Sequence, residues 1–123
     1  MKTVAVVSFV LLAGLALGLS AQGEKKDPPA EVKGDATAGR RIYKAHCSLC
    51  HFADAAIVKV GPGMKDLFKQ KKLPLTGLPM TEENVRKRVA EGNPDPQKPL
   101  MPAYKDILTA KEMDDLMAYL KTL

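Results

Sequence analysis

Apolar positions recur at helical spacing in three parts of the chain, and we find no convincing alternation of the kind that predicts a strand. The first part runs from Ala36 to about His46 and follows Asp35, a typical N-cap residue. Its apolar face includes Gly39, and glycine inside a helix costs roughly 1 kcal/mol relative to alanine. We therefore expect another helix to pass close to Gly39; a glycine tolerated near a helix start is the alternative.

The other two predicted helices lie in the second half of the chain. One covers residues 82 to about 91, between the N-cap candidate Thr81 and the stop signal Gly92. The last helix begins with Thr109 and Glu112, which form a T-x-x-E capping box. Its apolar stripe consists of Met113, Leu116, Met117 and Leu120. A shorter apolar face, expected before the second helix, consists of Met64, Leu67 and Phe68. The pattern predicts an all-α fold with long loops.

The first 34 residues stand outside this helical pattern. Residues 1–21 begin with a charged start at Lys2, continue as an apolar run and end in small residues, which is the layout of a secretory signal peptide. An uncleaved membrane anchor is the alternative, because about 20 apolar residues can span a bilayer. Residues 22–34 are polar and predict a flexible linker. Residues 35–123 then form one domain, which we expect in the periplasm, either free or tethered to the inner membrane by residues 1–21.

Composition leaves this domain short of apolar material for a core. Aromatic residues make up 5% of the chain, and there is no tryptophan. A domain of this size buries a limited fraction of its surface and gains stability from a staple or a cofactor. A buried cofactor would supply the missing apolar mass, although the composition does not identify one.

Cys47-x-x-Cys50-His51 carries the candidate chemistry of the chain. Two cysteines at this spacing followed by a histidine form the attachment signature of a c-type haem. The two thiols can add to the two vinyl groups of one porphyrin, and His51 then lies where an imidazole nitrogen can reach the iron.

Other uses of the two cysteines fit less well. They are the only cysteines in the chain, and a disulfide between them would close too short a loop to stabilise a fold. A zinc site needs four ligands, and besides the two cysteines the chain has no cysteine or histidine other than His46 and His51 to supply the remaining two. A thioredoxin-type redox pair would need strands around it, and the pattern predicts none.

From Asp35 to Leu123 the chain resembles a class I, mono-haem cytochrome c. The resemblance implies the cytochrome c fold, in which the N- and C-terminal helices cross at a small residue and long loops wrap around one covalently attached haem c. It rests on a helix that leads into the C-x-x-C-H motif, a following Gly61-Pro62, a late Met101-Pro102 and an amphipathic closing helix. The positions that match the helix crossing are Gly39 and Tyr43 on the first helix, with Leu116 and Tyr119 on the last.

The resemblance also implies how the iron is held. His51 would bind from one side, and Met101, followed by Pro102 as the family's axial methionine is, would bind from the other. The carbonyl of Pro62 would accept a hydrogen bond from the outer N–H of His51 and so fix the ring. Met64 and Met80 stay open as alternative ligands, and we expect Met113 and Met117 in the core. The haem propionates have no firm partner, and Tyr104, Arg86 and Arg88 are the candidates.

An iron with two protein ligands has no open site for a substrate, so we expect a periplasmic one-electron carrier rather than an enzyme. A haem c subunit of a larger periplasmic oxidoreductase is the alternative, followed by a haem-based sensor or small-ligand binder. The chain carries a formal charge of +5, and removal of residues 1–21 with Lys2 leaves +4. Such a surface can steer docking onto acidic patches of redox donors and acceptors, or it can simply be a solvated face. The absence of a nucleic-acid motif and the exported location argue against nucleic-acid binding.

Overall fold

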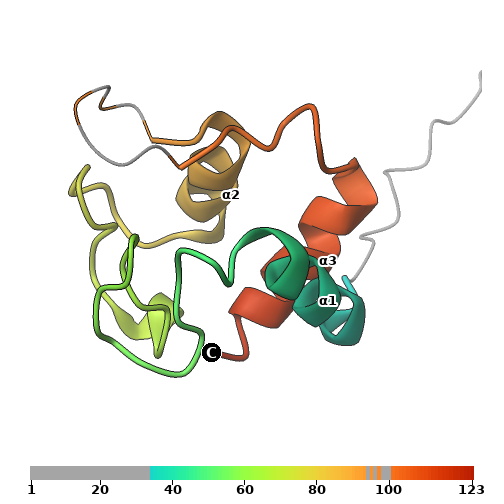
Figure 1. Cartoon of the computed structure of the whole chain (residues 1–123), viewed down its shortest axis with the longest axis horizontal. Coiled ribbons are helices and arrows are strands. Elements are labelled where there is room, and N and C mark those ends of the chain that lie inside the picture. The colour runs from blue at the N-terminus through green and yellow to red at the C-terminus, as the bar shows by residue number, and fades with distance from the viewer. Residues whose placement is uncertain (1–33, 94, 96, 98–100) are drawn as a thin grey trace, which may run out of the picture.

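The computed structural model describes residues 34–93, 95, 97 and 101–123. Its helices are α1 (Ala36–His46), α2 (Glu82–Glu91) and α3 (Ala110–Leu120), with one short 3₁₀ turn at Leu67–Lys69 (Figure 1). Within these residues the only strand-like pairing is an isolated bridge between Lys72 and Pro79. The predicted all-α fold and its helix positions are confirmed. The predicted signal peptide, residues 1–21, and all of the predicted linker but Gly34 lie outside the described residues.

Local capping signals explain where each helix begins. The Asp35 carboxylate accepts a hydrogen bond from the Thr37 N–H at 2.7 Å, and Thr81 caps α2 with its hydroxyl oxygen. At α3 the capping box is complete, because the Glu112 N–H donates to the Thr109 hydroxyl while the Thr109 N–H donates to the Glu112 carboxylate at 2.8 Å. Such caps satisfy backbone donors that the first helical turn leaves without partners. No helix among the described residues is both long and apolar enough to cross a bilayer.

Helices α1 and α3 cross at Gly39, as the resemblance implied. A Cβ atom added to Gly39 would lie 1.9 Å from the carbonyl oxygen of Asp115, so the two backbones approach more closely than any side chain would allow. Beside this point the rings of Tyr43 and Tyr119 pack with their centroids 5.4 Å apart. Leu116 on α3 is only 1% exposed. The crossing is therefore closed by protein side chains alone.

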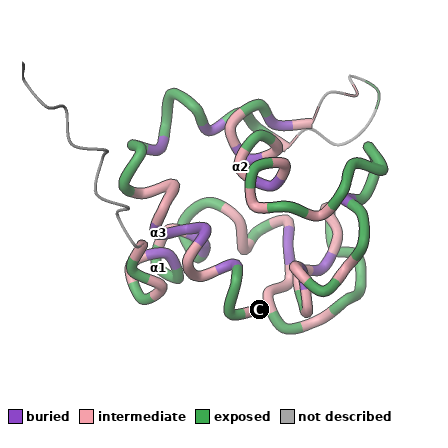
Figure 2. Tube along the Cα trace, turned by 180° about the vertical axis from the view of Figure 1, so that it is seen from behind, coloured by how far each residue is buried: buried purple, intermediate pink, exposed green. Residues whose placement is uncertain are grey.

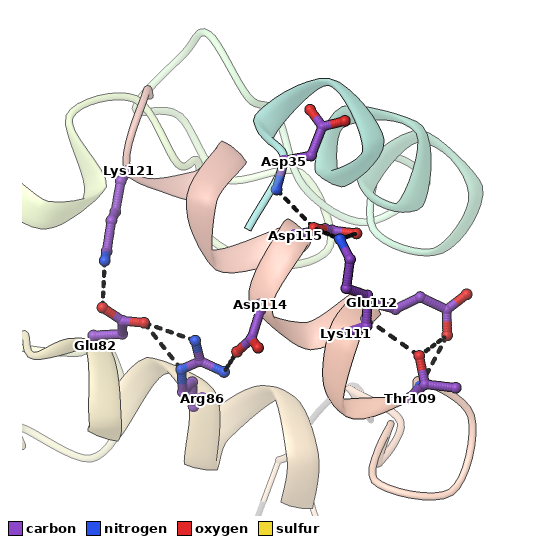
Figure 3. A network of polar contacts seen from close by, with 9 residues as sticks. All are labelled: Asp35, Glu82, Arg86, Thr109, Lys111, Glu112, Asp114, Asp115 and Lys121. Carbon is purple, nitrogen blue, oxygen red and sulfur yellow. Dashed lines mark hydrogen bonds and ion pairs between the residues drawn. The ribbon is translucent and has the colours of Figure 1, made fainter. Parts of the chain in front are cut away.

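A buried carboxylate ties the start of α1 to α3. Asp115 accepts a hydrogen bond from the backbone N–H of Asp35 at 2.6 Å and from the ammonium of Lys111 at 2.7 Å (Figure 3). The Lys111 hydrogen bond, followed by the Asp35 N–H, holds the pKa of Asp115 below its usual range. One carboxylate thus serves a backbone donor of one helix and a cation of the other.

Ion pairs link α2 to α3. The Arg86 guanidinium bonds Glu82 on its own helix at 2.8 Å and Asp114 on α3 at 2.6 Å (Figure 3). Lys121, just after α3, also pairs with Glu82. The side chains of these groups are between 27% and 51% exposed, so each pair contributes no more than about 1 kcal/mol.

The core lies beneath α3, where Leu116, Met117 and Leu120 are each 1% exposed. The tube in Figure 2 shows buried positions along the helices and only scattered ones in the loops. Met113 packs against this core from a half-buried position. Met113 and Met117 therefore lie where the sequence predicted them.

Candidate haem site

An apolar cavity of about 370 Å³ opens between the end of α1, helix α2 and the loops that follow both. This volume falls within the range of about 300–1,000 Å³ that is usual for ligand pockets. In Figure 1 the green chain after α1 runs along one edge of the molecule, and the orange chain after α2 runs along the opposite edge. All five site residues singled out from the sequence line this one cavity: Cys47, Cys50, His51, Pro62 and Met101.

The cysteines sit in a tight turn that continues directly from α1. The Cys47 N–H donates to the carbonyl of Tyr43 at 2.8 Å, and the N–H groups of Cys50 and His51 both donate to the carbonyl of Cys47. The Tyr43 hydroxyl donates to the carbonyl of His51 at 2.8 Å and so pins the end of the turn. Both thiols are free, and burial, with a smaller contribution from Cys50, raises the pKa of Cys47 to about 11. The turn therefore presents two free thiols to one cavity.

The His51 ring is held by two contacts that fix its orientation. Its Nδ1 lies 2.8 Å from the carbonyl oxygen of Pro62. Because that oxygen can only accept, Nδ1 carries the proton, and Nε2 is the nitrogen with a lone pair. A Cβ atom added to Gly61 would lie 2.3 Å from Cε1 of the ring, so only glycine leaves room for the imidazole. His51 is 8% exposed and keeps one orientation.

The segment that carries Met101 is anchored to the C-terminal end of α2. The Asn93 N–H donates to the carbonyl of Met101 at 3.0 Å, and the Tyr104 N–H donates to the carbonyl of Val89 at 3.1 Å. Gly92 ends the helix with a φ of 74°, and a Cβ atom there would lie 2.4 Å from the Met101 oxygen. Met101 is therefore placed by a hydrogen bond to its own carbonyl and by one that Tyr104 makes three residues further along the chain.

Only two of the five methionines in the described part of the chain line the cavity, namely Met64 and Met101. Met80, the second alternative from the sequence, packs against the hydrophobic core. Met64 follows Pro62 by two residues, and its N–H donates to the carbonyl of Phe52 at 2.7 Å. Met64 thus belongs to the segment that also holds His51, whereas Met101 arrives from a different one.

The three residues considered as partners of the haem propionates differ in whether they line the cavity. Arg86 is engaged with Glu82 and Asp114, away from the cavity lining. Arg88 lines the cavity, and its guanidinium donates to the carbonyl of Gly92 at 3.1 Å. Tyr104 also lines the cavity, and its hydroxyl donates to the carbonyl of His46.

Sequence reasoning missed three exposed apolar side chains that line the cavity: Val58, Val60 and Leu75. Leu75 has a φ of 73°, a conformation that costs a non-glycine residue roughly 1–2 kcal/mol. These residues lie in loops without periodicity, so no pattern in the sequence distinguishes them from solvated loop positions.

Comparison with known proteins identifies the family. The family model described as "Cytochrome c" matches residues 36–123. The chain belongs to the cytochrome c family. With one C-x-x-C-H motif, it is a class I, mono-haem cytochrome c, and it is an electron carrier rather than an enzyme.

Individual relatives of this cytochrome agree with that assignment. It is 32% identical over 92 residues to a "Cytochrome c-553-like" protein of Synechocystis sp., covering 75% of this chain and 72% of the relative. It is 31% identical over 91 residues to "Cytochrome c-554(547)" of Halothiobacillus neapolitanus, covering 73% and 98%. Among solved structures it resembles cytochrome c6 of the diatom Phaeodactylum tricornutum, with a TM-score of 0.51, 26% identity and 72% and 93% of the two chains covered.

This cytochrome carries one covalently bound haem c, and its residues fit that group. The two free thiols and the imidazole come from one turn and line one cavity. Gly61 lies so close to the His51 ring that no side chain would fit between them. The Pro62 carbonyl sets the tautomer of His51 that leaves Nε2 available to a metal. Cys47 and Cys50 would form the thioether bonds, and His51 would supply the imidazole ligand.

Proposed function

We propose that this cytochrome is a periplasmic one-electron carrier whose haem iron is bound by His51 and Met101. The observation that carries the proposal is that the two side chains line the same cavity from separate segments, each held by backbone hydrogen bonds of its own. Haem iron between a histidine and a methionine exchanges one electron at a raised potential and has no open position for a substrate.

His51 has the features of a tuned ligand. The Pro62 carbonyl at 2.8 Å from Nδ1 fixes the ring and increases its basicity. The Tyr43 hydroxyl holds the carbonyl of the same residue from the buried side. His51 can therefore keep one geometry in both oxidation states, which keeps the reorganisation during electron transfer small.

Met101 is the better candidate for the second ligand than Met64. Met64 lies two residues from Pro62, in the segment that already holds the imidazole. Met101 lies after α2, on a segment whose backbone N–H groups donate hydrogen bonds to carbonyls of α2. A ligand from an independent segment can bind a metal from the side that the histidine leaves open.

The partners of this carrier are redox proteins, and we infer that they dock near the cavity mouth. Lys71 and Lys72 are exposed and directly precede Leu73, which lines the cavity. Positive charge at that place favours donors and acceptors with acidic patches and speeds the encounter. Residues 1–21 support export to the periplasm, with a membrane tether if they are retained.

The decisive test is the pair of variants Met101→Ala and Met64→Ala, purified with haem attached. We expect Met101→Ala to lose the weak optical band of methionine bound to ferric haem and to lower the reduction potential. Met64→Ala, a matched loss of one cavity-lining thioether, should keep the band. Loss of the band in Met64→Ala and its survival in Met101→Ala would reverse the assignment.

A haem c subunit of a larger oxidoreductase is the second candidate. The exposed apolar rim favours it, because Val58 is 71% exposed and Leu75 is 62% exposed beside the cavity. Gel filtration of native extract separates the two functions. A free carrier elutes near the mass of this chain, and a subunit elutes far above it.

A further inference from the structure

Tyr104 connects the two segments on which the candidate ligands lie. It follows Met101 by three residues, is 8% exposed and lines the cavity. Its hydroxyl donates to the carbonyl of His46 at 2.9 Å, across 58 positions of sequence. Its ring also meets the His46 ring edge-on, with centroids 5.7 Å apart. His46 is the last residue of α1 and directly precedes Cys47.

The other end of Tyr104 is equally constrained. Its backbone N–H donates to the carbonyl of Val89, so the residue is fixed to α2 as well as to α1. Burial raises the pKa of Tyr104, which keeps the hydroxyl a proton donor at neutral pH. Within the described part of the chain, no other side-chain hydrogen bond joins residues 101–108 to residues 46–51.

We propose that Tyr104 is a positioning residue that holds Met101 within reach of the iron. The inference rests on the proposed function, in which Met101 is the second ligand. The hydroxyl fixes the spacing between the segment of Met101 and the turn that carries Cys47, Cys50 and His51. Without that hydrogen bond, the segment of Met101 moves away more often and leaves a coordination position open.

The other two tyrosines provide a contrast. Tyr43 also donates to a backbone carbonyl, but Tyr43 on α1 and its acceptor His51 both belong to the attachment side. Tyr119 packs its ring on Tyr43 at the crossing of α1 and α3 and does not line the cavity. Tyr119→Phe therefore removes a phenolic hydroxyl without touching the connection between the two segments.

The test compares Tyr104→Phe with Tyr119→Phe as full-length holoproteins, by titrating the ferric form with imidazole. An external ligand binds in proportion to the fraction of molecules whose iron is open. Loss of one hydrogen bond should raise the imidazole affinity of Tyr104→Phe roughly 2- to 10-fold. Tyr119→Phe should bind imidazole as the wild type does. Phenylalanine keeps the ring and its packing, so the variant is expected to fold.

A purely structural role gives a different result. If Tyr104→Phe lowers the urea midpoint but binds imidazole with wild-type affinity, Tyr104 does not position Met101 and the inference is overturned. The Met101→Ala spectrum separates this outcome from failure of the proposed function. If Met101→Ala keeps the methionine band, Met101 is not the ligand, and both conclusions fall. If the band disappears there while Tyr104→Phe behaves as wild type, only the Tyr104 inference falls.

Discussion

The helix crossing and the haem cavity are built in opposite ways. At the crossing, Gly39 brings two backbones into contact and Leu116 is 1% exposed, so protein atoms fill the space. Around the cavity, Val85 and Val89 of α2 are buried, but the loop residues Val58 and Leu75 are mostly exposed. The crossing is stabilised by its own side chains, whereas the exposed part of the cavity wall would gain apolar contacts from a bound haem. From this difference we expect haem attachment to stabilise the fold as well as to supply the chemistry.

Removal of the attachment sites should have the largest effect. The double variant Cys47→Ala/Cys50→Ala loses covalent haem, and its cavity walls then lose their apolar contacts. We expect its cooperative thermal transition, followed by far-ultraviolet circular dichroism, to be lost or strongly lowered. Ser48→Ala, in the same turn, should melt like the wild type. A double variant that melts at the wild-type temperature would show that the cavity region folds without haem.

Breaking the crossing should cost stability and leave the haem spectrum unchanged. In Gly39→Ala the new methyl group meets the Asp115 carbonyl at 1.9 Å, and we expect a loss of about 3 kcal/mol in urea unfolding. Gly77→Ala is the control, because a Cβ atom there meets nothing within 4 Å and only the φ of 67° is strained. It should lose about 1 kcal/mol. Equal losses in the two variants would contradict the close contact.

The equivalent change at the cavity should alter the iron more than the fold. In Gly61→Ala the methyl group meets the His51 ring at 2.3 Å and disturbs the hydrogen bond to Pro62. A less basic imidazole stabilises the ferric state less, so the reduction potential should rise by tens of mV. Voltammetry of Gly61→Ala beside Gly39→Ala checks this. The comparison fails if Gly39→Ala shifts the potential as much.

Acid should weaken the polar contacts between the helices, and we expect this loss of stability to be the smallest of the predicted effects. Hydrogen bonds from Lys111 lower the pKa of Asp115, and those from Lys121 and then Arg86 lower the pKa of Glu82. Carboxylates of this kind stabilise the fold fully above their unfolded pKa, near 4, and stop doing so as the pH falls through their folded pKa. The urea midpoint should therefore fall as the pH drops below about 4. Asp115→Asn should be less stable than the wild type at pH 7, and its urea midpoint should decrease less as the pH drops. If the urea midpoint of the variant decreases as much as that of the wild type, Asp115 does not contribute to the acid sensitivity.

Local signals made the helices predictable from the sequence. Asp35, Thr81 and Thr109 mark the three helix starts through hydrogen bonds within a few residues of themselves. Cys47, Cys50 and His51 form a local motif as well. The roles of Pro62 and Met101 were predicted from the family resemblance, because no local motif around either residue indicates an iron site.

Long-range contacts were not predictable in this way. The hydroxyl of Tyr104 meets His46 58 positions away, and Arg86 meets Asp114 on another helix. Such contacts depend on where whole segments pack, and no periodicity or spacing records them. The left-handed backbone of Leu75 is likewise set by its turn, since leucine itself disfavours that conformation.

The mass of the mature protein tests the account most directly. The protein is expressed in cells that attach haem to exported proteins, and its digest is analysed by mass spectrometry under denaturing conditions. The account predicts a polypeptide carrying one haem, with the added mass on the peptide that contains Cys47 and Cys50. A protein with the mass of the bare polypeptide would contradict it.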